Sequence, residues 1–355
     1  MTDSFIKYTV NKYKKLFILF LFSFALISAN AYNAYLHYNF PLSVDDENYF
    51  KMAQGNYDVS ITRRYRVIIP AVAGIIANPI SRIYKNLWPH RPETTWPVRL
   101  GFLLVNSFIM SLSGVLIFLL CEAYGNSFFT SLITTIIILT CRWTTYFAGT
   151  VSTDSLYFFI ILLVIYAIKI KNNLMSTIAI FIGPFAKESF LFIAPLIFFF
   201  SSIPKKKQVI LFLLSGILIF SVRFFIDSQL GSPYYSSINN AFEHFENFRA
   251  TLFNLFSIKG FFEVFSVLGL YFIIIIIGFT GGKEKVKLWL KYVDMPLIIL
   301  FLIIWFHVFL SAQVGRMLFY ATPLWAVVIA LIIEHHPGFD FLSGLKGKGI
   351  DIRNL

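Results

Sequence analysis

Charged residues are scarce in this sequence. Asp, Glu, Lys and Arg make up 14% of the 355 residues, whereas soluble domains carry about a quarter. Hydrophobic residues reach 57%, so the chain has too little polar surface to cover a soluble globule. These proportions exclude a soluble fold, and we expect one integral membrane domain over residues 1–355.

Cysteines and repeats are also scarce. The only two cysteines, Cys121 and Cys141, lie at opposite ends of one predicted helix. They are too far apart to form a disulfide, and neither has neighbours suited to binding zinc. The chain shows no internal repeat or glycine-rich linker, which argues against the repeat symmetry of many transporters.

Positive charge is in excess, with 30 Lys and Arg against 18 Asp and Glu and a formal net charge of +12. In a soluble protein this balance would suggest a nucleic-acid partner, but no basic stripe interleaved with aromatic residues occurs in a polar segment. Basic residues that flank membrane helices on the cytoplasmic side explain the excess instead. We therefore expect membrane lipids as partners and no nucleic acid.

The apolar runs predict an all-α polytopic membrane protein with about ten transmembrane helices, between nine and eleven. The first helix covers residues 16–36 and is expected to be retained, although Ala29-Asn30-Ala31 after a lysine cluster resembles a signal-peptide cleavage site. The remaining helices fall within residues 100–333, in runs at 100–120, 128–141, 156–168, 174–185, 190–200, 209–226, 265–279, 296–310 and 317–333. Several of these runs are short for a hydrocarbon layer of about 30 Å.

The short loops predict the topology. Lysines cluster before the first helix, at 169–171, 205–207 and 283–291, and in a tail over residues 335–355. Alternation places all of them on the cytoplasmic side of the cell membrane, together with both termini, provided that residues 67–83 do not cross. Residues 37–97 then form a first extracytoplasmic loop with interfacial helices, and residues 228–263 form a second.

This topology gathers unusual charges on the outer face. The first loop contains Asp45, Asp46 and Glu47 in succession, then Tyr49, and later Arg63, Arg64 and Arg66. Four further charges lie at or within apolar runs, namely Asp154, Lys187, Glu188 and Arg316. A charge inside the membrane costs about 2.5–3.5 kcal/mol on insertion scales, so such residues usually face a cavity or a partner.

Each charge also has an ordinary interpretation. Asp154 would cap a helix that begins at Ser155, and Lys187 and Glu188 would pair with each other at the end of a broken helix. Arg316 would merely flank its helix. Acidic and basic residues nevertheless converge at one face of the membrane, and this convergence favours a functional site.

Sugar transfer from a polyprenyl phosphate can use these groups. An aspartate can accept the proton of the acceptor hydroxyl, and cations can stabilise the phosphate leaving group. Arginine binds phosphate oxygens with two parallel hydrogen bonds. If residues 45 and 46 are extended, their side chains point in opposite directions, so only one of Asp45 and Asp46 can be the base.

The order of these motifs resembles the GT-C superfamily of polytopic glycosyltransferases that use polyprenyl-phosphate sugars. The resemblance covers roughly residues 12–333 and is carried by Asp45-Asp46-Glu47-Asn48-Tyr49, Arg64-Tyr65-Arg66, Ser152-Thr153-Asp154-Ser155, Ala186-Lys187-Glu188-Ser189 and Gly315-Arg316-Met317. It implies Asp45 or Asp46 as the catalytic base. The other outer charges and Tyr49 are candidates for binding the substrate.

The expected function is therefore an inverting hexosyl- or pentosyltransferase that acts on a lipid-linked glycan or another acceptor. No separate carboxylate set demands a metal, and a divalent cofactor is left open. The alternatives are a flippase or transporter of lipid-linked sugars, and a polymerase or acyltransferase of envelope glycans. His244 in the second outer loop would lie on a solvated helix face.

Overall fold

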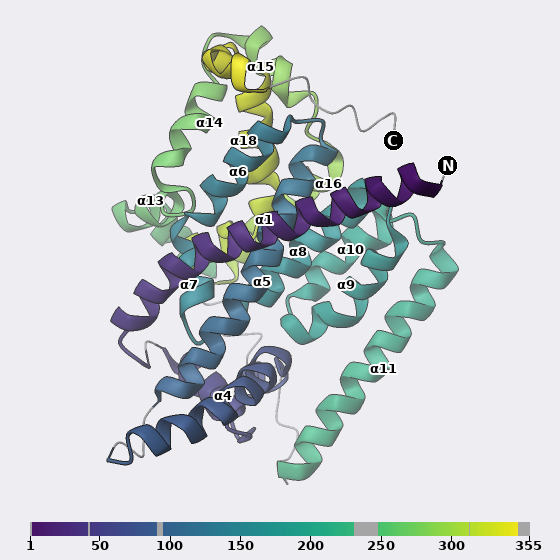
Figure 1. The fold of residues 1–355 in the computed structure, drawn as a ribbon. Coiled ribbons are helices and arrows are strands. Elements are labelled where there is room, and N and C mark those ends of the chain that lie inside the picture. Colours follow the sequence, from purple (N-terminus) through teal and green to yellow (C-terminus); the bar gives the residue numbers. More distant parts are fainter. Residues whose placement is uncertain (1, 42, 91–94, 231–247, 312, 347–355) are drawn as a thin grey trace.

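The computed structural model describes residues 2–41, 43–90, 95–230, 248–311 and 313–346, and every regular element in these ranges is a helix (Figure 1). The first half of the chain forms α1 (Thr2–His37), α2 (Val44–Ala53), α3 (Ile61–Arg64), α4 (Ile68–Leu87), α5 (Trp96–Ala123), α6 (Phe128–Leu139), α7 (Arg142–Gly149) and α8 (Asp154–Lys169). The second half forms α9 (Asn173–Ala186), α10 (Phe190–Phe200), α11 (Lys205–Leu230), α13 (Ile258–Phe265), η1 (Gly269–Tyr271), α14 (Phe272–Gly278), α15 (Lys283–Leu290), α16 (Met295–Phe309), α17 (Val314–Phe319), α18 (Thr322–His335), η2 (Pro337–Leu342) and α19 (Ser343–Lys346).

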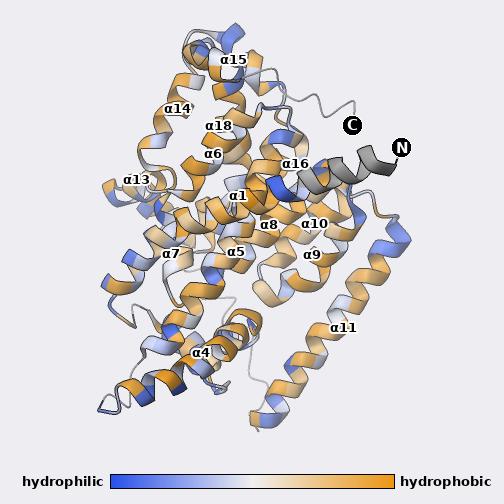
Figure 2. Cartoon of the chain, in the orientation of Figure 1, coloured by the Kyte–Doolittle hydropathy of each residue, from blue (hydrophilic) through white to orange (hydrophobic). Residues whose placement is uncertain are grey.

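Helices α5, α8 and α18 form the interior of the bundle. Most of their side chains are buried, because these helices are apolar around their whole circumference and have neighbours on every side. Aromatic rings fill the centre, where Phe158 stacks on Phe319 and Tyr157 meets Tyr320 edge to face. Hydrophilic residues gather at the helix ends and connections (Figure 2).

Three described helices are long and apolar enough to cross a membrane, namely α1 from Tyr13, α5 and α11. The number rises to six if each of three sharply bent helix pairs counts as one span. The protein is thus an α-helical membrane protein, but the predicted nine to eleven spans are not confirmed. The physical reason is length, since α9, α10 and α18 are apolar but have only 10–17 residues.

The first loop is helical and packed onto the bundle. Residues 67–83, predicted not to cross, fall in α4 and its N-cap Val67, and α4 is not among the described helices that are long and apolar enough to cross a membrane. Helix α4 packs tightly on two neighbours, because Gly74 lies against the Ala53 carbonyl of α2 and Gly101 of α5 lies against the Ala73 carbonyl. These contacts fix the acidic helix α2 relative to α5.

The close approach of α4 and α5 gives a stability prediction. In Gly101→Ala, the new Cβ would lie 2.4 Å from the Ala73 carbonyl oxygen, so the helices must move apart. We expect a loss of about 1–3 kcal/mol, measured as a lower midpoint of thermal unfolding in detergent. The control is Gly216→Ala in α11, where the Cβ would meet nothing within 4 Å. An equal midpoint for the two variants would contradict the close packing.

Candidate active site

The acidic stretch forms the first turn of helix α2. The extended conformation considered for residues 45 and 46 is therefore wrong. Ser43 is the N-cap, and its side chain and the Asp46 side chain form a capping box with the backbone. Asp46 is buried and also accepts a hydrogen bond from the Tyr38 hydroxyl. Asp45 takes a different partner, since Arg63 Nε donates to its Oδ1 at 2.7 Å. The capping box makes Asp46 a structural residue.

Asp154 lies at the centre of a buried ionic cluster. Its side chain is 1% exposed, with Arg316 Nη2 at 2.5 Å from Oδ2 and Lys187 Nζ at 3.4 Å from Oδ1. The Tyr320 hydroxyl donates to Oδ1 at 2.5 Å, and the Ser152 hydroxyl donates to Oδ2 at 2.8 Å. The expected capping role is wrong, because the carboxylate points at these partners and the Ser152 hydroxyl accepts from the Asp154 backbone N–H.

A second ionic group adjoins the first. Arg66, between α3 and α4, donates from Nη2 to Glu188 Oε2 at 2.8 Å and from Nη1 to the Tyr49 hydroxyl at 2.6 Å. Burial alone would lower the pKa of Arg66, but Tyr49 and Glu188 raise that pKa well above its ordinary value. The guanidinium therefore stays charged.

Adjacency suggested that Lys187 and Glu188 pair with each other, but each of them has a different partner. The backbone of Lys187 is extended after the end of α9, with φ −166° and ψ 143°, so successive side chains point in opposite directions. Lys187 reaches Asp154, while Glu188 reaches Arg66. The break between α9 and α10 thus supplies one residue to each ionic group.

The two groups form one site beside α2. Tyr49 interacts electrostatically with Arg66, Asp45 and Asp154, and Tyr146 of α7 interacts with Arg316, Asp154 and both aspartates of α2. We call Arg66, Asp154, Lys187, Glu188 and Arg316 the buried cluster, of which Glu188 is the most exposed member, with 36% of its side chain accessible. The cluster has three positive and two negative charges, a net charge of +1. This excess suits an anionic ligand.

Three predicted site residues have other contacts. Arg64 Nη1 bonds Asp227 of α11 at 3.0 Å, and Tyr65 bonds the same carboxylate at 2.8 Å. Burial and the bond to Asp227 raise the pKa of Tyr65 to about 12. Arg64 therefore fastens α11 to α3.

Glu47 and Arg63 also lie apart from the buried groups. Glu47 pairs with Lys51 on the surface of α2, and Arg63 reaches only the edge of the site through Asp45.

Sequence reasoning missed four residues that complete these networks, namely Tyr38, Tyr146, Asp227 and Tyr320. Asp227 could have been predicted from one feature of the sequence, because it is an acidic residue at the end of a long apolar run. The three tyrosines gave none, since tyrosine is common at membrane interfaces. His244 lies outside the described residues. In the part of the chain that the structure describes, no three His, Cys, Asp or Glu side chains form a group suited to a metal.

Comparison of the chain with protein-family models, curated proteins and solved structures found no match.

The pairing of Asp154 with Arg316 gives a second prediction. Breaking a buried ion pair from one side costs about 3–5 kcal/mol, because the remaining charge is left without its partner. Arg316→Gln and Asp154→Asn should each lower the thermal midpoint strongly, and the double variant should lose clearly less than the sum. Additive losses would contradict the coupling. Lys287→Gln is the control, because its pair with Glu284 is fully at the surface and should change stability little.

Proposed function

We propose that the chain is an inverting glycosyltransferase that takes a sugar from a polyprenyl-phosphate donor. The observation that carries the proposal is the buried cluster, in which Arg66, Lys187 and Arg316 outnumber Asp154 and Glu188 beside the acidic turn of α2. Its residues are those that carry the resemblance to the GT-C superfamily. The reaction is assigned to the extracytoplasmic face, with a lipid-linked glycan or another acceptor.

The cations of the cluster have hydrogen-bonding capacity left for a phosphate. Arg316 uses Nη1 on Gln313 and Nη2 on Asp154, while its buried Nε has no hydrogen-bond partner among the described residues. Lys187 Nζ makes only long contacts, at 3.4 Å to Asp154 and 3.4 Å to Tyr320. A phosphate oxygen can therefore replace weak contacts of Lys187 and complete the fork of Arg316. The apolar tail of the donor would lie among the membrane helices.

Asp45 is the better candidate for the base. Asp46 is committed to the capping box and Tyr38, whereas Asp45 contacts Arg63 through its Oδ1 atom. Its side chain is 22% exposed, so an acceptor hydroxyl can approach it. The hydroxyl oxygen would attack the anomeric carbon while Asp45 takes its proton. The bond from that carbon to the phosphate oxygen breaks, and the electron pair leaves on the phosphate, stabilised by Arg66, Lys187 and Arg316.

The two aspartates of α2 give a third prediction. Asp45→Asn should lower the turnover of lipid-linked donor by about 10²–10⁴-fold, the usual contribution of a positioned base, with little change in the thermal midpoint. Asp46→Asn should instead lower stability by about 1 kcal/mol, since it weakens the cap. Turnover is measured in proteoliposomes with a panel of synthetic polyprenyl-phosphate sugars. Asp58→Asn in the same loop is the control, because Asp58 is exposed. Normal turnover of Asp45→Asn would remove Asp45 as the base.

The loosely held lysine gives a fourth prediction. Lys187→Met removes one of the three cations of the cluster, so the leaving phosphate loses part of its stabilisation. We expect kcat to fall by about 10²–10³-fold and unglycosylated polyprenyl phosphate to bind more weakly. Lys169→Met is the matched control. Lys169 is the last residue of α8, whereas Asp154 of the cluster is the first, and Lys169 pairs with Asp294 outside the cluster. Unchanged kcat together with unchanged binding of the lipid phosphate would contradict the assignment.

A further inference from the structure

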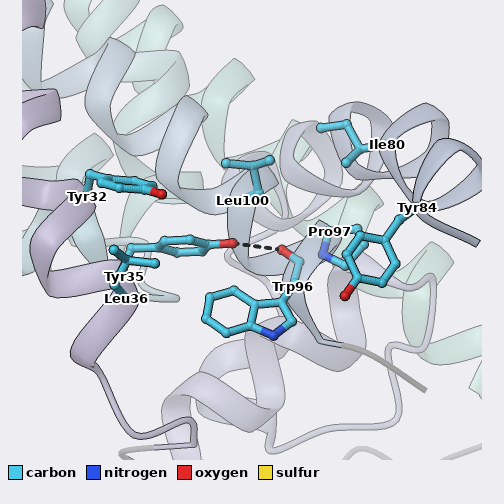
Figure 3. Close-up of a pocket in the computed structure, with 8 residues that line it drawn as sticks. All are labelled: Tyr32, Tyr35, Leu36, Ile80, Tyr84, Trp96, Pro97 and Leu100. Atoms are coloured by element: carbon cyan, nitrogen blue, oxygen red, sulfur yellow. Dashed lines mark hydrogen bonds between the residues drawn. The ribbon is translucent and has the colours of Figure 1, made fainter. Parts of the chain in front are cut away.

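A pocket with a volume of about 360 Å³ opens where α1, α4 and the start of α5 meet (Figure 3). The volume lies within the usual range for small-ligand sites. Half of the eight residues that line it are aromatic, with Tyr32 and Tyr35 from α1, Tyr84 from α4 and Trp96 from α5. Tyr32 is 53% exposed and Trp96 36%, so the pocket is accessible from outside the protein.

Polar atoms converge inside these aromatic walls. The Tyr35 hydroxyl donates to the Trp96 carbonyl oxygen at 3.4 Å, across the pocket from α1 to α5 (Figure 3). Tyr35 also interacts electrostatically with Tyr32 and Tyr84, so the three phenol groups of the lining lie near one another. An acyl chain would offer no hydrogen bond to the hydroxyls of Tyr32 and Tyr84, which argues against a purely apolar occupant.

A buried arginine behind the pocket excludes cationic ligands. The Arg99 guanidinium lies 4.7 Å from the centre of the Trp96 ring and 5.2 Å from that of Tyr35, and it is fixed by the carbonyl oxygens of Tyr35 and Tyr38. Its charge already occupies the negative potential of these ring faces. A quaternary ammonium group, the usual ligand of an aromatic cage, would meet repulsion here.

We infer that this pocket binds a neutral pyranose ring. One face of such a ring is formed by C–H groups that pack on aromatic rings, and its hydroxyls can bond phenol and carbonyl groups at the edge. The combination of aromatic walls, convergent hydroxyls and a buried cation suits this chemistry better than that of an acyl chain or an ammonium group.

The pocket is connected to the acidic helix. Arg99 holds the carbonyl oxygen of Tyr38, and the Tyr38 hydroxyl donates to Asp46 in the first turn of α2. The wall of the pocket is therefore linked, through Arg99 and Tyr38, to the helix that carries the proposed base. We assign the sugar in the pocket to the acceptor glycan, a step that rests on the proposed function, whereas the binding itself does not.

The experiment measures sugar binding without donor or turnover. The protein in nanodiscs of phosphatidylethanolamine and phosphatidylglycerol is titrated with methyl glucoside, galactoside, mannoside and N-acetylglucosaminide, and saturation-transfer NMR detects ring protons that contact protein. At least one glycoside should bind saturably. Trp96→Ala and Tyr32→Ala should each weaken that binding about tenfold. Tyr13→Ala, which removes another exposed tyrosine of α1, should leave it unchanged.

Three outcomes would overturn the inference. They are no saturable transfer to any of the four glycosides, transfer that Trp96→Ala leaves unchanged, and displacement of the sugar by tetramethylammonium. The Asp45→Asn protein separates this result from the proposed function. If it binds the glycoside normally but lacks turnover, both proposals stand, and if the native protein turns over donor without binding any glycoside, only the pocket assignment fails.

Discussion

The burial of the Asp154 carboxylate is the constraint on which the site depends. A carboxylate that is 1% exposed among apolar helices is tolerated only when cations and hydroxyls surround it. Arg316, Lys187, Tyr320 and Ser152 fulfil that need, and they come from three segments of the chain, namely α17 with the residue after it, the break between α9 and α10, and the turn before α8. One charge at the start of α8 therefore fixes the positions of α17 and of the break between α9 and α10.

The same charge balance links the bundle to the first loop. Glu188 pairs with Arg66, the cation of the cluster that Asp154 does not contact, and Arg66 also donates a hydrogen bond to Tyr49 of α2. The acidic turn is thereby fixed next to the cluster through two hydrogen-bonded steps. An ionic network of this kind suits phosphate chemistry, since its donors are oriented before a ligand arrives and need little reorganisation.

The sequence predicted the helices better than their partners. The apolar run at 190–200 coincides with α10, and charge at the ends of apolar runs indicated Asp154, Lys187, Glu188 and Arg316 as members of one site. The pairings could not be predicted, because they depend on local backbone geometry. The extended backbone of Lys187 separates it from Glu188, and the cap at Ser43 makes α2 a helix in which Asp46 is structural. The bond from Arg64 to Asp227 spans 163 positions, and no local pattern indicates it.

Helix α11 is the least buried of the three long apolar helices, since only 11% of its most apolar 18-residue stretch is buried. Ser215 bonds the Ile180 carbonyl of α9, and Asp227, near the far end, bonds Arg64 of α3 and Tyr65 directly after it. Many of its large apolar side chains are exposed, and lipid would cover them in a bilayer. A thinner or thicker bilayer changes the tilt of such a helix, and that tilt would pull directly on the contact with α3, two residues before Arg66. The thickness of the surrounding membrane is thus a mechanical input to the site.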